Sequence, residues 1–577
     1  MNTYQIAGSL LVLVGLSACG GGGGNPGSCS GSDAVCGRNV SSGTTTTTTT
    51  TTPTVTTPVV SGAYVEPTPQ IAANVAGQCA APRAASVLDP STGRPYGDVQ
   101  GSLTTEKLWI RAFINDTYLW YDEVVPQDPA LFVLGASAPF VEPSDNSRRS
   151  IFLSTNTLAA TTYFNSQRTT AVTASGRPKD QFHFTIPTAD YTAQSTAGVS
   201  GGFGFQVALL ASTPPRKAVV AYSDPGSVAA QNNLGRGAEF ITVNGVSVAN
   251  GSAATLNEGL FSPVTGQRYS FEVRDVGSTA TRTIVMTAGA VTSVPVQNVR
   301  TLPAPYTSVG YLQFNDHIAT AEGQLVAAVN QLKAANNGAG ITDLVLDMRY
   351  NGGGLLAIAS ELAYMVAGPA TTRGKVFEKL SFNNKNPFGL TDADTATPFY
   401  TTTLGFSLPA GQALPQLGLA RVFVLTGAGT CSASESVMNG LAGAGVQVIQ
   451  IGATTCGKPY GFLPQDNCGT TYFAIQFKGV NHVGYGDYSD GFVPGGSGNQ
   501  FAGCVVADDF SKPLGDVGEA RLATALQFRQ TGTCTATAVA SSNGVRSATA
   551  ALVRAAEPEL GRGFYRENRI YRSARLN

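Results

Sequence analysis

This sequence has almost no net charge, no closely spaced pair of cysteines and few histidines. The formal net charge is −1 and charged residues make up 13% of the chain, so composition gives no electrostatic case for binding nucleic acid. No C-x-x-C pair occurs, so the sequence lacks the spacing typical of a structural zinc site. Only three histidines are present. We therefore predict neither a metal site nor a cofactor.

The sequence also lacks an N-terminal apolar run long enough to span a bilayer. The run Ile6–Leu16 is short and ends in Leu16-Ser17-Ala18-Cys19, which resembles a bacterial lipobox. The resemblance implies that residues 1–18 are removed and that Cys19 is acylated, anchoring the protein to a membrane of the bacterial cell envelope. Gly20 favours the outer membrane, facing the periplasm or the exterior. Met1–Gln5 contains no Lys or Arg, and an uncleaved apolar start is the alternative.

Nine cysteines occur, and a lipidated Cys19 leaves eight. That is an even number in a compartment that permits disulfides, so four bridges are possible. By proximity in the sequence we expect the pairs Cys29/Cys36 and Cys468/Cys504, although the sequence alone does not fix the connectivity.

Composition and periodicity divide the chain into six parts. The Gly- and Thr-rich stretch after the signal, with the run Thr44–Thr52, predicts an unstructured tether, and the Arg-rich end predicts a solvated tail rather than a binding site. The predicted parts are a signal (1–18), a tether (19–74), an N-terminal mostly helical domain (75–197), a β-rich domain (198–290), an α/β core (291–535) and a tail (536–577).

Within the N-terminal domain, bulky apolar residues recur at helical spacing over Glu106–Tyr121. Both tryptophans of the chain lie in this segment. We interpret it as a core-facing amphipathic helix in preference to an aromatic substrate-binding cluster.

Short β-type runs fill residues 198–290 and resemble a PDZ domain. The resemblance is carried by Gly202-Phe203-Gly204-Phe205, by Asp224–Ala230 before a helix, and by the turn Val243–Gly245. It implies that a peptide adds as a strand at a sheet edge while backbone N–H groups of the Gly202–Phe205 loop bind its terminal carboxylate. The alternative is a β-domain that acts only as a spacer.

Strands and helices alternate over residues 291–535, which predicts a mostly parallel sheet covered by helices. Three strands are each followed by a Gly- or Ser-containing loop. These strand-loop units are Asp343–Met348 with Arg349–Gly354, Arg421–Thr426 with Gly427–Glu435, and Val446–Gly452 with Thr454–Pro459. Because parallel strands end at one edge of the sheet, we expect Gly352–Gly354, Ser432 and Lys458 to converge there.

These residues suit acyl transfer. Ser432 would begin a helix, and the glycines allow backbone N–H groups to approach an oxyanion. A serine needs a base, and none of the three histidines follows a strand in these three loops, whereas Lys458 does. A lysine acts as a base only when neutral, so its reference pKa of about 10.4 must be lowered in an apolar pocket.

The segments Leu346–Gly353, Ser432-Ala433-Ser434-Glu435 and Gly457-Lys458 resemble, in order, the motifs of the C-terminal-processing (tail-specific) serine peptidases. The resemblance implies a crotonase/ClpP-like α/β core with Ser432 as nucleophile and Lys458 as base. It also implies an oxyanion hole at Gly353, Gly354 and Ala433. Ser434 is rejected as the nucleophile.

Two features depart from the family pattern. The family often has a Gln four residues after the lysine to orient it, but here that residue is Phe462, and Gln465 is a conjectural substitute. The lysine is also followed by Pro459 rather than Gly, and Cys431 and Cys456 flank the predicted dyad, either as a bridge or as small core residues.

The sequence thus predicts a membrane-anchored serine endopeptidase that hydrolyses extended or misfolded envelope polypeptides, recognised near their C-termini by the PDZ-like domain. The alternative from another class is a catalytically silent lipoprotein that binds peptides or other ligands on the same fold. The sequence indicates no oligomeric state.

Overall fold

The computed structural model describes residues 64, 66, 71–90, 92–534, 559–561 and 569–570. The predicted signal, Cys19, the Cys29/Cys36 pair and the Thr-rich run lie outside the described residues. Within those residues, no helix is both long and apolar enough to cross a membrane.

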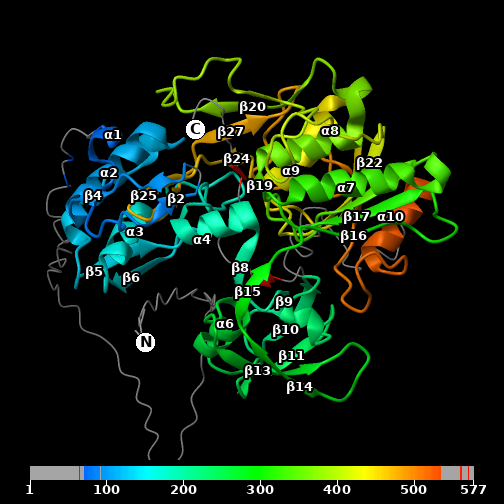
Figure 1. The fold of residues 1–577 in the computed structure, drawn as a ribbon, viewed down its shortest axis with the longest axis horizontal. Helices are drawn as coiled ribbons and strands as arrows, with labels where there is room; N and C mark the ends of the chain where they lie inside the picture. Colours follow the sequence, from blue (N-terminus) through cyan, green and yellow to red (C-terminus); the bar gives the residue numbers. More distant parts are fainter. Residues whose placement is uncertain are drawn as a thin grey trace, which may run out of the picture.

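A six-stranded sheet forms the core of residues 291–535, at the right in Figure 1, and five of its strands run parallel. Only β16 at one edge is antiparallel to its neighbour. In spatial order the strands are β16 (Val296–Thr301), β17 (Val309–Phe314), β18 (Asp343–Asp347), β22 (Arg421–Thr426), β23 (Gln447–Gly452) and β28 (Ala502–Val505). The predicted mostly parallel α/β core is confirmed.

Helices cover both faces of this sheet. Alternate residues of β18 show the arrangement, because Leu344 and Leu346 join the core under one set of helices while Val345 joins the core on the other face. Strands buried on both faces need nearly continuous apolar sequence, as β18 and β22 have. The first face carries α7 (Ala321–Ala334), α8 (Leu356–Thr372) and α9 (Ala433–Ala444), and the second carries α10 (Ala520–Thr531).

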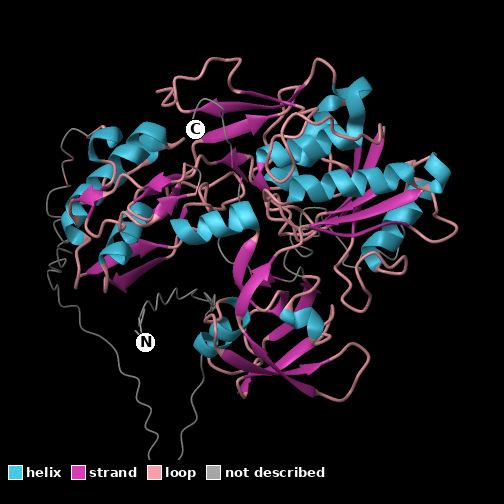
Figure 2. Cartoon of the chain, viewed as in Figure 1, coloured by secondary structure: helices cyan, strands magenta, loops and turns pink. Residues whose placement is uncertain are grey.

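A second, antiparallel sheet corresponds to the β-rich region of residues 198–290 (Figure 2). Its core is aromatic, with Phe203, Phe240 and Phe271 packed together. The strands are β9 (Phe205–Ala211), β10 (Lys217–Ser223), β11 (Glu239–Val243), β12 (Val246–Ser247), β13 (Arg268–Arg274) and β14 (Arg282–Thr287), with α5 (Val228–Gln231) and α6 (Ala253–Phe261). The polypeptide enters this β-rich region through β8 (Val199–Gly202) and leaves it through β15 (Gly289–Thr292), and these two strands pair with each other.

The N-terminal region contains more helix than strand. The predicted helix of Glu106–Tyr121 is observed as α2 (Leu103–Thr117), with Trp109 buried as expected for a core-facing helix. Its other elements are α1 (Ala72–Val75), α3 (Asn156–Ser166), α4 (Thr188–Thr192) and the strands β1 (Gln78–Cys79), β2 (Leu88–Asp89), β3 (Arg94–Pro95), β4 (Val99–Gln100), β5 (Ser137–Val141), β6 (Arg148–Phe152) and β7 (Phe184–Pro187).

This region is joined to the core by a strand and by a disulfide. β7 pairs with β26 (Thr470–Phe473), and Cys79 is bonded to Cys468. The expected pair Cys468/Cys504 is therefore wrong. Cys468 lies in the hairpin that faces the N-terminal region, whereas Cys504 lies on the edge strand β28 and bonds to Cys534. Tertiary packing, and not sequence proximity, decides these partners.

Short strands complete the core above the carboxyl ends of the main sheet. They are β19 (Gly354–Leu355), β20 (Val376–Phe382), β21 (Ala396–Pro398), β24 (Tyr460–Gly461), β25 (Gln465–Asn467) and β27 (Phe477–Val480). Two strands come from the C-terminal tail: β29 (Glu559–Gly561) pairs with β9, and β30 (Arg569–Ile570) pairs with β19. The expectation of a solvated tail is therefore wrong for these two segments, because unpaired sheet edges accept their backbones.

Candidate active site

Ser432 lies between β22 and α9 in an unusual backbone conformation. Its φ is +62° and its ψ is −116°, a region that a residue with a Cβ rarely adopts and that costs on the order of 1–3 kcal/mol. A sharp, strained strand-to-helix turn presents the nucleophilic serine of α/β-hydrolases. The side chain is buried, and its Oγ has no hydrogen-bond partner among the residues that the structure describes. The described contacts therefore fix the backbone of Ser432, through its N–H, and not its hydroxyl.

Glu435 maintains this turn and ties it to the loop of Lys458. One carboxylate oxygen, Oε2, accepts the backbone N–H groups of Ser432 and Lys458, both at 2.9 Å. The other, Oε1, accepts the Gly457 N–H at 2.9 Å and the Thr455 hydroxyl at 2.6 Å. Burial raises the pKa of the Glu435 carboxyl, and these four donors act against that rise. Glu435 thus fixes the relative position of two loops that 25 residues separate.

Lys458 follows β23 in a loop that requires a glycine. Gly457 has a φ of +87°, and a Cβ there would lie 2.3 Å from the Ser489 carbonyl oxygen. The Lys458 side chain is buried, and its Nζ lies 4.1 Å from the ring centroid of Phe462 and 4.4 Å from that of Phe182. Two aromatic faces thus border the amine where a glutamine was expected.

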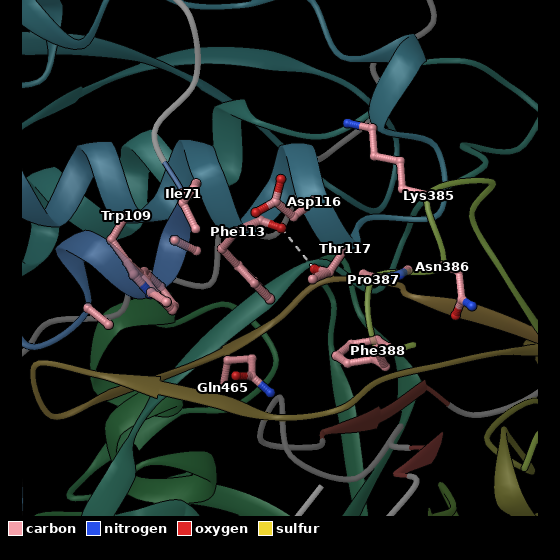
Figure 3. Close-up of a pocket in the computed structure, with 13 residues that line it drawn as sticks. Ile71, Trp109, Phe113, Asp116, Thr117, Lys385, Asn386, Pro387, Phe388 and Gln465 are labelled. Atoms are coloured by element: carbon pink, nitrogen blue, oxygen red, sulfur yellow. Dashed lines mark hydrogen bonds between the residues drawn. The ribbon is translucent and has the colours of Figure 1, made fainter. Parts of the chain in front are cut away.

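Gln465 does not take the place of that glutamine. It lines a separate cavity of about 570 Å³ together with Trp109, Phe113 and Phe388, as Figure 3 shows. That cavity lies between the N-terminal helices and the loop of residues 385–388 and contains none of the predicted catalytic residues. A second cavity, of about 530 Å³, is bordered by Tyr460, which follows Lys458 by two residues in the sequence.

A disulfide joins Cys431, directly before the serine, to Cys456, two residues before the lysine. Of the two readings of these cysteines, the bridge is the one observed. Cys431, Glu435 and Cys456 also place three potential metal ligands within 4.8 Å of one another. The two sulfurs are bonded to each other, and the Glu435 oxygens already accept four hydrogen bonds. The disulfide therefore links the turn of Ser432 covalently to the loop of Lys458.

The three predicted oxyanion residues, Gly353, Gly354 and Ala433, differ in the contacts of their backbones. Gly354 has a φ of +133°, and a Cβ there would lie 2.4 Å from the His317 carbonyl oxygen, so only glycine fits. The Gly353 N–H donates to Asn351 Oδ1 at 2.9 Å. Ala433 is the first residue of α9, so its N–H has no acceptor within the helix.

Asn351 is a residue whose importance the sequence analysis missed. Its side chain contacts Gly353, His317 and the Phe314 carbonyl, and its own carbonyl accepts the Cys431 N–H at 3.1 Å. It therefore connects the oxyanion loop to the turn before Ser432. Its position inside the Arg349–Gly354 segment was the available signal.

His317 does not follow any of the three predicted strands, as the sequence analysis stated, but it pairs with Gly354 at the glycine loop. It follows β17, which was not among the three strands considered, and its backbone bridges Gly354. Burial lowers the pKa of His317 to about 3, although hydrogen bonds to Asn351 and Gly353 favour the charged form. The imidazole is therefore neutral over the physiological range and supports the glycine loop.

A buried ionic cluster links the β-rich sheet to the segment before the oxyanion glycines. Arg236 lies before β11, and its Nη2 is 2.7 Å from Asp508 Oδ1, an atom that also lies 2.7 Å from Arg349 Nη1. Burial opposes ionisation of Asp508, but Arg236, Arg521 and Arg349 outweigh it and hold its pKa far below the usual range. Arg349 is held further by Asp347 and Glu519.

The predicted peptide-binding loop Gly202–Phe205 connects β8 to β9. Phe203 is buried, and its ring stacks on Phe205 with the centroids 5.5 Å apart. Gly204 has a φ of +82°, and a Cβ there would lie 2.2 Å from Ser227 Cβ. The loop therefore sits at the start of β9, at the sheet edge that β29 occupies.

Comparisons with known proteins agree with this architecture. Residues 308–464 match the model of the family described as Peptidase family S41. No curated protein sequence matches the chain significantly. Among solved structures, a candidate S41 protease from Bacteroides fragilis NCTC 9343 is 21% identical with a TM-score of 0.51, covering 76% of this chain and 98% of its own. The photosystem II D1 C-terminal processing protease is 18% identical with a TM-score of 0.37, covering 69% of this chain and 92% of its own.

The family match includes Gly353, Gly354, Ser432 and Lys458, and this homology supports a serine peptidase activity. The likeness to the Bacteroides protein supports the same fold. Residues 308–464 of this chain therefore match the model of peptidase family S41, within a larger chain whose fold is similar to that of the Bacteroides protein.

Proposed function

We propose that the protein is a serine endopeptidase in which Ser432 and Lys458 form the catalytic dyad. The observation that carries the proposal is the backbone of Ser432, held at positive φ by the carboxylate that also holds the Lys458 loop. A buried residue keeps a strained conformation only when its surroundings impose it, and such strain is concentrated at functional sites.

In the proposed reaction, Lys458 Nζ accepts the hydroxyl proton as Ser432 Oγ attacks the peptide carbonyl carbon. The proton passes to the leaving amine as the C–N bond breaks, which leaves an acyl-enzyme. Water then attacks the ester, with Lys458 again as the base. Lys458 is completely buried, and a lysine in this role must be neutral to accept the proton.

The oxyanion would be bound by the N–H groups of Gly354 and Ala433, which lies at the N-terminus of α9. Gly353 can add its N–H only after that group leaves Asn351 Oδ1. The substrate-free and substrate-bound forms of the loop would therefore differ at this hydrogen bond.

The test is cleavage of an unfolded, fluorescently labelled casein by the intact chain and by Ser432→Ala and Lys458→Ala. Loss of at least 10³-fold in kcat/KM is expected for each, because both belong to one catalytic unit. Ser434→Ala and Lys333→Ala are the matched controls, since Ser434 Oγ donates to the Asn351 carbonyl and Lys333 lies exposed on α7. Equal activity of all five proteins, or equal inactivity, would reject the dyad.

We further propose that the substrates are extended or misfolded polypeptides and that the PDZ-like region delivers them by their C-termini. The edge of β9 supports this proposal, because it accepts an added antiparallel strand next to the Gly202–Phe205 loop. A substrate with a free C-terminal carboxylate should be cleaved faster than its C-terminally amidated form. Equal rates would reject carboxylate recognition.

The proposed location is the bacterial cell envelope, with the chain anchored through lipid on Cys19. Metabolic labelling with a fatty-acid probe, compared between the intact chain and Cys19→Ser, tests the anchor. Labelling of both proteins, or of neither, would reject it. The silent-binding alternative predicts instead that peptides bind but are never cut, and the casein assay separates the two functions.

A further inference from the structure

The C-terminal tail contributes a strand to each of the two edges that a substrate would need. β29 pairs antiparallel with β9 in the register Glu559 with Leu209, Leu560 with Ala208 and Gly561 with Val207. The tail therefore runs toward the Gly202–Phe205 loop, which is the direction that a C-terminal peptide ligand takes when it adds to such an edge.

The second strand lies at the catalytic loops. β30 pairs parallel with β19 in the register Arg569 with Gly354 and Ile570 with Leu355, and it also contacts β24. β19 begins at Gly354 of the oxyanion loop, and β24 begins two residues after Lys458. β30 thus lies next to strands from both sides of the proposed dyad.

One continuous segment connects the two positions. Residues 562–568 separate the strands and can span at most about 26 Å when fully extended. The β9 edge and the β19 edge are therefore close enough to be occupied together by a single peptide of ordinary length.

The rest of the site is closed in the same structure. Ser432 and Lys458 both have an exposed fraction of 0%. The Gly353 N–H, which would face an oxyanion, is bonded to Asn351. Because β30 lies beside Gly354 and both dyad residues are buried, a substrate cannot reach the site in this structure.

We propose that the two tail strands β29 (Glu559–Gly561) and β30 (Arg569–Ile570) are a built-in peptide ligand of this chain, competing with substrates for the edges of β9 and β19. Binding of the tail needs no catalysis. Only its consequence, slower cleavage of substrates, rests on the proposed peptidase function. A tethered ligand is present at an effective concentration on the order of millimolar, so it can exclude substrates even when its intrinsic affinity is weak.

The binding test uses the full chain with Ser432→Ala, so that no cleavage can occur. Proline lacks an N–H, so Leu560→Pro should remove β29 and Ile570→Pro should remove β30, while Ala540→Pro is the control outside both strands. The probe is a labelled synthetic peptide of residues 553–577. We expect it to bind Leu560→Pro and Ile570→Pro at least about tenfold more tightly than the parent or the control.

Hydrogen exchange provides a second readout. Amides of Val207–Leu209 should exchange faster in Leu560→Pro, and those of Gly354 and Leu355 should exchange faster in Ile570→Pro, than in the Ala540→Pro control. Unchanged peptide affinity together with unchanged exchange would overturn the proposal.

The same substitutions, made in the chain that keeps Ser432, show whether this proposal and the proposed peptidase function stand or fail independently. Faster casein cleavage by Leu560→Pro, by at least about threefold, is the expected result. If no variant cleaves casein but the peptide binds as expected, the peptidase function fails and the built-in ligand stands. If the wild-type chain removes its own tail while Ser432→Ala keeps it, as intact mass would show, the tail is a substrate and its role as a standing competitor is overturned.

Discussion

Glu435 and Lys458 are joined by a hydrogen bond of 2.9 Å from the lysine backbone N–H to Oε2, the same oxygen that accepts the Ser432 N–H. One carboxylate therefore sets the separation between the strand-to-helix turn of the serine and the loop of the lysine. A carboxylate suits this position because each of its oxygens can accept two hydrogen bonds.

The first prediction concerns Glu435→Gln. An amide offers only one accepting oxygen, so two of the four donors would face an NH₂ group. We expect kcat/KM on casein to fall at least about 100-fold, which corresponds to roughly 2.7 kcal/mol of transition-state stabilisation.

Glu322→Gln is the matched control for this substitution. Glu322 is also buried and accepts four backbone N–H groups, from Leu404, Gly405, Ser407 and Leu408, away from the dyad. Both variants should have a lower free energy of unfolding in urea, but only Glu435→Gln should have a lower kcat/KM under conditions where both variants are folded. Parallel losses in the two variants would mean that Glu435 serves the fold alone.

The second prediction concerns the ring of Phe462, which lies 4.1 Å from Lys458 Nζ. A ring face stabilises an ammonium by about 0.5–2 kcal/mol, so Phe462→Leu should make the charged lysine less favourable. The acid limb of the kcat/KM profile should then move to lower pH by about 0.5–1 unit.

Phe473→Leu controls for lost packing, because Phe473 is equally buried and its ring packs on Phe462 with the centroids 5.6 Å apart. Its acid limb should stay at the wild-type pH. A limb that moves equally in both variants, or toward higher pH in Phe462→Leu, would contradict a direct contact between the ring and the amine.

What the sequence could predict was local. The strand Arg421–Thr426 is observed with the predicted bounds, because a strand buried on both faces has a nearly continuous apolar sequence. The positions of Ser432 and Gly354 follow from motifs next to such strands. The sequence could not predict contacts between distant segments, namely the Cys79–Cys468 bond, the place of His317 beside Gly354 and the pairing of β30 with β19. These depend on tertiary packing, which has no local signature.

The third prediction concerns the ionic cluster around Asp508. Arg236→Ala removes the partner that the β-rich sheet contributes and leaves Arg349, which precedes the oxyanion loop, with an altered neighbour. Breaking a buried pair costs about 3–5 kcal/mol when the remaining charge is unpaired, and Asp508 keeps Arg349, so we expect a loss of about 2 kcal/mol. kcat/KM should fall about fivefold or more, since the loop loses part of its support.

Arg282→Ala is the comparison, because Arg282 pairs with the exposed Asp275 on the same sheet, and surface pairs contribute about 0–1 kcal/mol. Urea unfolding and casein cleavage measure both effects. A loss of stability in Arg236→Ala without any change in kcat/KM would show that the cluster does not act on the site.

The fourth prediction concerns His317, whose pKa is lowered by burial to about 3. Between that value and about 6.5 the unfolded chain binds a proton that the folded chain does not, so stability from this residue falls as the pH is lowered. The loss between pH 7.5 and pH 5.5 is about 1.4 kcal/mol for one such histidine. His317→Gln should lose that much less than the wild-type chain over the same interval, measured by urea unfolding. Identical losses would indicate that His317 is protonated in the folded state.

The fifth prediction concerns the disulfide between Cys431 and Cys456. In the chain-entropy view, a loop closed over a separation of 25 residues stabilises the fold by about 3.5 kcal/mol. The Cys504–Cys534 bond closes a similar separation of 30 residues at the sheet edge, outside the Ser432 and Lys458 loops. Replacing either pair with alanines should therefore reduce the free energy of unfolding by a similar amount.

Activity should distinguish the two bonds. The first joins the residue before Ser432 to the loop of Lys458, and misplacement of catalytic groups by about 1 Å can cost 100-fold in rate. We expect Cys431→Ala/Cys456→Ala to lose at least about tenfold in kcat/KM at a temperature where both double variants are fully folded, and Cys504→Ala/Cys534→Ala to keep wild-type activity. If both pairs reduce activity equally, the Cys431–Cys456 bond contributes only to stability, and Glu435 alone sets the spacing of the two loops.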